Sequence, residues 1–270
     1  MPAIDLARLK TQAARLAEKF DQPEAFIAGL KLLLDVYTNR TIRASQVVQR
    51  YSIPTYNTPR PVLRQIEIEL TPLAAVHPLE AIALTKALWA AGNLESRLLA
   101  ASLLGCIPSA QAIPALSSLP DWLSRSTDRE VHAALLSDAL ARVRRENPST
   151  FFLILENWLA SPRPSFQIWG MQALIPLLRD PHFENLPAVF RIVLPAIRAA
   201  GPMTQIDLQA CIAALERVSL TETLAFLREI LHDQPSPVLL RTIRRILPGL
   251  SPELQSALKE ILRAQNMQVK

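Results

Sequence analysis

The residues in this sequence that are best suited to chemistry are its arginines, because several of them cluster in patterns that suit phosphate groups. Between Val36 and Ile66 the sequence holds five arginines and all three of its tyrosines, with no lysine and no acidic residue. Guanidinium groups form paired hydrogen bonds with phosphate oxygens, and tyrosine offers an aromatic ring with a polar hydroxyl. Our candidate phosphate-contacting residues from this window are Arg43, Arg50, Tyr56, Arg60 and Arg64.

Other arginines share faces of expected helices. Arg241, Arg244 and Arg245 occupy positions i, i+3 and i+4, so they lie on one side of a helix. Arg191 and Arg198 are seven residues apart, which also places them on a common face. Clusters of this kind are common on solvated surfaces, and that reading stays open beside an anion-binding one.

Two further candidates come from the middle of the chain. Arg129 lies off the apolar stripe of an expected helix that begins at Asp128, so it faces either water or a ligand. Trp169 stands beside Phe166 and Gly170, which leaves its exposure open, although core packing is the usual state of a helical tryptophan. Both residues join the candidate contacts.

Motifs for metal binding, cofactor binding or nucleophilic catalysis do not occur in the sequence. The four histidines are separate and form no HxxxH or HExxH pattern, and the six glycines form no GxGxxG, GxxxxGK[ST] or GxSxG motif. Cys106 and Cys211 are isolated, which is typical of a reducing compartment. We therefore expect no metal site and no cofactor.

The elements that must position these residues are expected to be helices. Half of the 270 residues are apolar, leucine and alanine recur in runs, and glycine is rare. Many of the 22 prolines follow Ser or Thr, the order of an N-cap and first helical residue: Thr58-Pro59, Thr71-Pro72, Ser161-Pro162, Ser236-Pro237 and Ser251-Pro252. Thr127 and Glu130 are spaced as a capping box, and Gly92 and Gly201 as helix-ending residues.

These signals predict an all-α fold. The expected helices span 4–20, 22–38, 44–51, 59–70, 78–91, 94–105, 110–124, 128–146, 150–160, 164–179, 184–199, 204–218, 221–232, 237–248 and 252–265. From Pro78 onward they come in pairs that recur every 30 to 40 residues, the spacing of degenerate HEAT-like repeats. We predict a single curved solenoid over 1–270, with N-terminal helices in 1–75 and helical pairs in 76–270.

Charge and hydropathy restrict the partners. The formal charge of +5 favours an acidic partner such as nucleic acid over a basic one. The most apolar stretch, Leu98–Ile107, is much shorter than the roughly 20 residues of a membrane-spanning helix. The first residues, MPAIDLARLK, lack the apolar core of a secretory signal, so we expect a cytoplasmic protein that does not bind membranes.

Three segments together resemble the AlkD-type alkylpurine DNA glycosylases, a HEAT-like repeat family that removes alkylated bases from DNA. They are YNTPRPVLR at 56–64, LWAAGNLESRLLAASLLG at 88–105 and NPSTFFLILENWLAS at 147–161, and the similarity spans about Pro23 to His232. The resemblance implies a HEAT-like fold with a concave surface that faces DNA.

The resemblance does not extend to the family's catalytic residues. The family uses a Trp and an Asp one turn apart on one helix, then an Arg and a second Trp. Counting from Pro148, those positions fall on Arg129 for the first Trp, on Ala133 or, one register away, His132 for the Asp, near Trp169 for the Arg, and on Ala213 or Ala214 for the second Trp. Neither Ala nor neutral His supplies the carboxylate charge that stabilises a cationic sugar.

Three hypotheses follow. The first is a non-catalytic HEAT-like protein that binds DNA, or alternatively structured RNA, through arginines on a concave face. The second is a divergent alkylpurine DNA glycosylase in which Asp128 or Asp138 replaces the lost carboxylate. The third is a protein-interaction scaffold, which needs only a groove and a protein partner.

Overall fold

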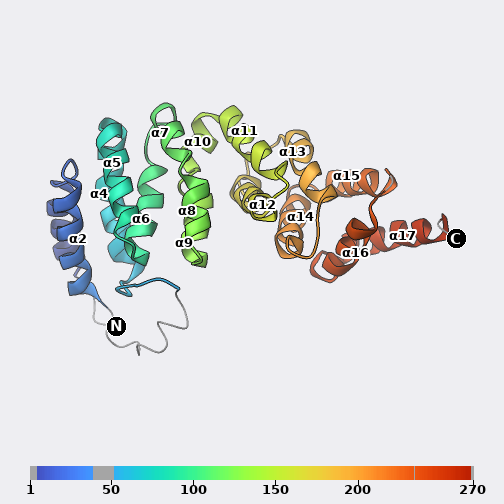
Figure 1. Cartoon of the computed structure of the whole chain (residues 1–270), viewed down its shortest axis with the longest axis horizontal. Coiled ribbons are helices and arrows are strands. Elements are labelled where there is room, and N and C mark those ends of the chain that lie inside the picture. Colours follow the sequence, from blue (N-terminus) through green and yellow to red (C-terminus); the bar gives the residue numbers. More distant parts are fainter. Residues whose placement is uncertain (1–4, 39–51, 234, 269–270) are drawn as a thin grey trace. The chain divides into compact units, whose positions relative to one another are not determined.

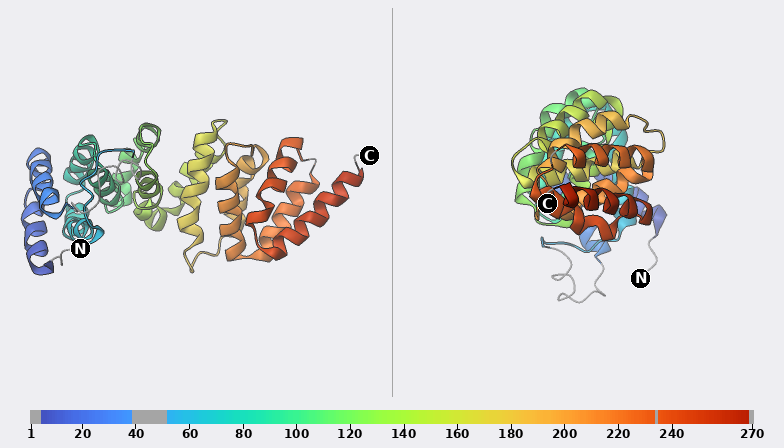
Figure 2. Two further views of the ribbon diagram at one scale, coloured as in Figure 1. Left: turned by 90° about the horizontal axis from the view of Figure 1, so that it is seen from below. Right: turned by 90° about the vertical axis from the view of Figure 1, so that its right-hand side faces the viewer.

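The structure is all-helical in the residues that it describes. The computed structural model describes residues 5–38, 52–233 and 235–268, and Figures 1 and 2 show helices joined by short segments, with no strand in these ranges. The all-α prediction is therefore confirmed. The expected helix 44–51, together with Arg43 and Arg50, lies outside the described residues.

The chain divides into two compact units, 1–148 and 149–270. The first contains α1 (Leu6–Ala17), α2 (Pro23–Tyr37), α4 (Arg60–Val76), α5 (Pro78–Ala90), α6 (Leu94–Leu104), α7 (Ser109–Leu116), α8 (Leu119–Arg125), α9 (Arg129–Ser137) and α10 (Ala141–Glu146). The second contains α11 (Pro148–Leu159, whose first residue ends the first unit), α12 (Pro164–Leu178), α13 (Leu186–Arg198), α14 (Gln205–Val218), α15 (Leu220–His232), α16 (Pro237–Ile246), a 3-10 turn (Leu247–Gly249) and α17 (Pro252–Gln268). A continuous solenoid over 1–270 stays a prediction.

Helices of the first unit pack in two rows. In one row α1 contacts α4, α4 contacts α6 and α6 contacts α9; in the other α2 contacts α5, α5 contacts α7 and α7 contacts α10. Contacts between α4 and α5 and between α5 and α6 join the rows around buried leucines such as Leu84, Leu88, Leu99 and Leu103. Almost all of α6 is buried, which makes it the central helix of this unit.

The second unit is built in a similar way. α12 contacts α14 and α14 contacts α16, while α15 contacts α17 and also packs on α14. The left view of Figure 2 shows the helices of this unit following one another in chain order, from yellow α11 to red α17. In both units each helix packs mainly against helices that are close to it in the sequence.

Proline signals located some helix starts and missed others. Ser236 and Ser251 bond the backbone N–H groups of Leu239 and Leu254, as an N-cap does. Pro72 instead lies inside α4, so the start predicted at Thr71-Pro72 is wrong. Pro120 is the second residue of a separate short helix, α8, which divides the helix predicted over 110–124.

Other predicted boundaries also shift. The N-caps of α4 and α9 are Pro59 and Asp128, so Thr58 and Thr127 do not cap, and the capping box at Thr127 is not formed. α12 begins at Pro164, as predicted for the helix 164–179, but its N-cap is Arg163, so Ser161-Pro162 does not mark its start. Gly92 has the left-handed φ of +78° expected of a helix-ending glycine, whereas α13 ends at Arg198 with Ala199 as its C-cap, before Gly201.

The helix predicted over 128–146 is interrupted at 138–140, where the chain forms a turn that packs against Gly105. Gly105, at the end of α6, lies so close to the turn that a Cβ built on it would be 1.8 Å from the carbonyl oxygen of Asp138. The backbone of the break therefore packs directly on the end of the central helix, which only glycine permits.

None of the described helices is long and apolar enough to cross a membrane.

The substitution Gly105→Ala should therefore destabilise the first unit. The added methyl group forces the end of α6 away from the turn at Asp138, and overpacking of this kind costs about 3 kcal/mol of unfolding free energy. Urea unfolding followed by circular dichroism measures the loss. Gly201→Ala is the control because its Cβ meets nothing within 4 Å, and equal stabilities of the two variants would contradict the prediction.

Candidate nucleic-acid interface

An extended segment, residues 52–59, connects the starts of three helices in the first unit. The N–H of Leu94 at the start of α6 donates to the carbonyl of Pro54 at 2.8 Å, and the N–H of Ser52 donates to Oδ2 of Asp128, the N-cap of α9, at 3.3 Å. The segment then continues directly into α4. Figure 1 shows it as the blue strand-like trace that runs past the lower ends of α6 and α9.

A buried carboxylate on α6 holds this segment in place. Glu95 is only 2% exposed, and its oxygens accept hydrogen bonds from the Thr55 hydroxyl at 2.8 Å, the Tyr56 N–H at 3.1 Å and the Thr58 N–H at 3.2 Å. A buried charge is tolerated only when hydrogen bonds satisfy it, and backbone N–H groups without secondary structure need acceptors. Glu95 and the segment therefore satisfy each other.

A second buried carboxylate joins the segment to α9. Asp128 is 4% exposed, and its Oδ1 caps the helix by accepting from the N–H groups of Glu130 at 2.9 Å and Val131 at 3.3 Å, while Oδ2 takes the Ser52 bond. Because α4, α6 and α9 begin beside one segment, their N-termini lie at one edge of the first unit. The positive ends of three helix dipoles meet there.

Four arginines belong to this edge, which we call the N-terminal edge. They are Arg60 in the first turn of α4, Arg64 one turn later, Arg97 on α6 and Arg129 at the start of α9. Arg60, Arg64 and Arg129 are exposed, and Arg97 is half-buried. The fold thus brings three of the sequence-predicted contacts together and adds Arg97, which the sequence analysis missed.

Arg97 has unusual surroundings. Its guanidinium lies over the ring of Trp89 at 4.6 Å, and Trp89 stacks in turn on Trp122 at 4.5 Å. Its Nε atom is buried without a hydrogen-bond acceptor in the described part of the chain. Burial lowers the pKa of Arg97 below its ordinary value, while the charge of Asp128 opposes that shift. The guanidinium stays charged at neutral pH, so an anion bound beside it would stabilise it.

Acidic residues also reach this edge, although the window between Val36 and Ile66 contains none. Arg60 pairs with Glu130 of α9 at 3.0 Å, and Arg64 pairs with Glu67 at 3.7 Å. Burial raises the pKa of the Glu67 carboxyl, and the charge of Arg64 opposes that shift. An acid-free stretch of sequence has therefore not produced an acid-free surface.

Tyr56 is part of the extended segment and is half-buried. Burial raises the pKa of its hydroxyl, and the negative charges of Asp35 and Glu95 add to that effect. The side chain is therefore a neutral phenol at physiological pH. Its backbone bond to Glu95 fixes its position next to the start of α4.

The candidates in the second unit have different fates. Trp169 is 5% exposed and packs against Trp158 and Phe166, with ring centroids 6.3 and 4.8 Å away. It is therefore a core residue, and its ring is not available for a contact with DNA. Arg198 is paired with Asp233 at 2.6 Å, and Arg191 lines a groove together with Glu222 and Glu229.

The arginine face of α16 is formed as predicted. Arg241, Arg244 and Arg245 are all exposed, while Leu239, Ile243 and Ile246 of the same helix are buried. The Nε of Arg241 bonds the carbonyl of Pro237 in its own helix. In the described part of the chain neither Arg241 nor Arg245 is ion-paired, so this face of α16 is a basic surface.

The carboxylates considered as substitutes for a catalytic Asp are already engaged. Asp128 is buried as the N-cap of α9 and holds Ser52, and Oδ1 of Asp138 accepts from the Ser137 hydroxyl at 2.7 Å. His132 lies with Nε2 between the carbonyls of Leu123 and Ser126 at 3.0 and 2.6 Å.

The described residues contain neither a metal-ligand cluster nor a fully exposed cysteine. The described residues contain no group of three or more His, Cys, Asp or Glu side chains that could hold a metal ion. Burial raises the pKa of the Cys211 thiol to about 12, so it is protonated and enclosed at neutral pH. Cys106 is half-buried, and its Sγ lies 3.5 Å from the Thr71 hydroxyl.

Comparison with known proteins adds no relative. No protein-family model, no curated protein and no solved structure matches the chain.

The structure of the N-terminal edge leads to a test of Glu95. In Glu95→Gln an amide NH2 replaces one acceptor oxygen, so the Tyr56 or the Thr58 N–H loses its partner at a cost of about 1–3 kcal/mol. Hydrogen exchange of those two amides should become faster. Glu80→Gln is the control because Glu80 is also in the first turn of a helix but is exposed. Unchanged exchange at 56 and 58 would show that Glu95 does not hold the segment.

Proposed function

We propose that this chain is a HEAT-like repeat protein that binds duplex DNA through contacts between arginines and phosphates. The two-row packing of helices within each unit supports the repeat organisation, and the resemblance to the AlkD-type family supports DNA as the partner. Binding is non-catalytic in this proposal, since the positions that match the family's catalytic residues carry other side chains. Structured RNA is the alternative nucleic acid.

The observation that carries the proposal is the state of Arg97. A guanidinium that lies over the Trp89 ring, is partly desolvated and has a buried Nε without an acceptor among the described residues is costly unless an anion binds it. A backbone phosphate at the N-terminal edge would accept from Arg97, and the exposed Arg129 and the helix N-termini would add to the attraction. The arginine face of α16 would supply phosphate contacts from the second unit.

The two ion pairs of the edge do not prevent such binding. Arg60 and Arg64 are largely exposed, and exposed pairs of this kind are worth at most about 1 kcal/mol. A phosphate can therefore replace Glu130 or Glu67 as the partner of these arginines. The acidic side chains nevertheless oppose the approach of DNA. Neutralising one of them should therefore strengthen DNA binding.

Three variants should differ in duplex binding: one should weaken it, one should strengthen it and one should leave it unchanged. Arg97→Gln should weaken it about tenfold and reduce the slope of log K against log salt by about 0.9, the loss of one phosphate contact. Glu130→Gln should strengthen it about twofold because it releases Arg60 and removes a negative charge. Arg15→Gln, on α1, should leave it unchanged. Fluorescence anisotropy between about 50 and 200 mM salt measures all three.

Several outcomes would contradict the proposal. No binding at low salt, a flat salt response, or equal effects of Arg97→Gln and Arg15→Gln would each do so. Thermal melting of every variant shows that it is folded. Tighter binding to duplex RNA than to DNA of equal length would select the RNA alternative.

A protein-interaction scaffold is the second candidate, and an apolar groove favours it. Leu32 and Val36 of α2 are 70% and 60% exposed, and they line a groove of about 540 Å³ with α1. Single exposed apolar residues are ordinary, but two neighbours in one groove suit a partner helix. Leu32→Ser combined with Val36→Ser should leave DNA binding unchanged, which separates this groove from the N-terminal edge. Weaker DNA binding by that double variant would place the groove in the DNA contact.

A further inference from the structure

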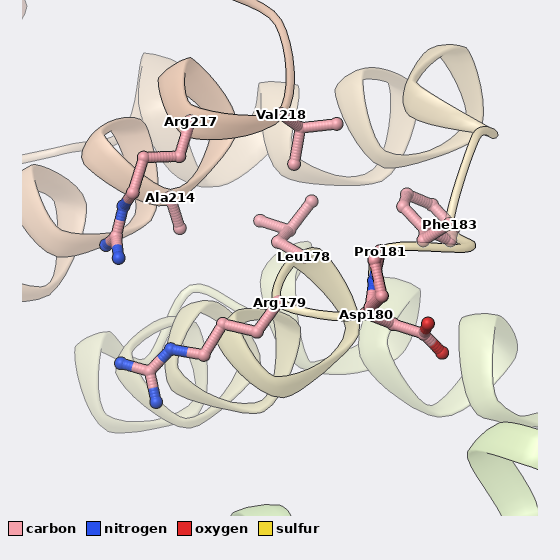
Figure 3. A pocket seen from close by; sticks show the side chains of 8 residues that line it. All are labelled: Leu178, Arg179, Asp180, Pro181, Phe183, Ala214, Arg217 and Val218. Carbon is pink, nitrogen blue, oxygen red and sulfur yellow. The ribbon is translucent and has the colours of Figure 1, made fainter.

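The second unit contains a cavity that plays no part in the proposed DNA contact. Its volume is about 480 Å³, within the range of small-molecule sites, and it lies between the ends of α12 and α14 and the segment that follows α12. Figure 3 shows the side chains that line it. Both helices belong to one row of the unit and pack directly against each other.

One part of the cavity wall is apolar. The buried Leu178 and Ala214 and the half-buried Val218 and Phe183 face the space, and Pro181 closes the side formed by the connecting segment. An aromatic ring or a short aliphatic chain placed there would lose its contact with water, which contributes about 25 cal/mol per Å² of apolar surface. The wall therefore suits the carbon part of a ligand.

The other part of the wall carries two arginines. Arg179 follows α12 and Arg217 lies in the last turn of α14, and both are exposed. In Figure 3 their guanidinium groups extend to the same side of the cavity, while the carboxylate of Asp180 extends to the other side. Oδ1 of Asp180 accepts the His182 N–H at 3.0 Å instead of pairing with an arginine.

Neither guanidinium forms an ion pair with a described residue. Arg217 uses only Nε, which donates to the carbonyl of Ala213 at 3.0 Å and so holds the side chain along its helix. Its two Nη groups remain for a ligand.

We propose that this cavity binds an organic phosphate monoester, with the phosphate between Arg179 and Arg217 and the organic group on the apolar wall. Two guanidinium charges match the near-dianionic phosphate of a monoester, and their planar donors fit its oxygens in pairs. A carboxylate would supply only one charge. An unsubstituted phosphate would leave the apolar wall unused.

The experiment measures binding of phenyl phosphate to the full chain by isothermal titration calorimetry. Arg179→Gln combined with Arg217→Gln should weaken binding at least about tenfold, because two charge-assisted contacts are lost. Arg228→Gln, an exposed arginine on α15, should bind as the unaltered protein does. Phe183→Ala should weaken phenyl phosphate severalfold and leave inorganic phosphate unchanged.

The proposal is overturned by any of four results with the phosphate ligands and variants, and by a fifth with benzoate. The four are no binding of phenyl phosphate, equal affinity for inorganic phosphate and phenyl phosphate, an unaffected double variant, and an equal loss in Arg228→Gln. Benzoate provides the comparison for charge, and affinity equal to that of phenyl phosphate would exclude the two-arginine match. Circular dichroism melting confirms that each variant is folded.

Discussion

The N-terminal edge depends on two buried carboxylates that act as hydrogen-bond acceptors for a segment without secondary structure of its own. Glu95 and Asp128 take donors from Ser52, Thr55, Tyr56 and Thr58, and they do so from the starts of α6 and α9. At a helix N-terminus the dipole favours negative charge, which offsets part of the desolvation of each carboxylate. The position of α4, and of the arginines at its start, follows from this attachment.

The same arrangement explains the state of Arg97. α6 is the central helix and is buried along most of its length, so a basic residue three positions after its first residue cannot reach solvent as freely as one on an edge helix. Trp89, which is itself stacked on Trp122, covers one side of the guanidinium, and both carboxylate oxygens of Glu95 already accept hydrogen bonds from the segment. In the described part of the chain, an edge built on hydrogen-bonded carboxylates thus also contains a cation whose buried Nε has no acceptor.

How much of this could be predicted differs between the fold and the site. The helices followed from Ser-Pro steps, apolar periodicity and the rarity of glycine, because those signals act locally. The break at Asp138 did not, since the turn there packs closely on Gly105 of another helix, and no local signal in 128–146 indicates that contact. Likewise the pairing of Arg60 with Glu130 joins residues 70 positions apart, and no property of the window around Arg60 announces it. The surroundings of Arg97 could not be predicted either, because its contact with Trp89 and its burial depend on how α5 and α6 pack together.

The N-terminal edge and the cavity between α12 and α14 differ in which ends of their helices carry the arginines. At the N-terminal edge the dipoles and the arginines have the same sign, so the protein must bring carboxylates to the edge or bind an external anion. At the cavity between α12 and α14 the arginines lie at C-termini, where cations complement the dipole without any ligand. A charge argument alone would therefore assign a ligand to the first site only. What distinguishes the cavity is its shape, because dipole compensation explains two exposed arginines but not the enclosed apolar wall beside them.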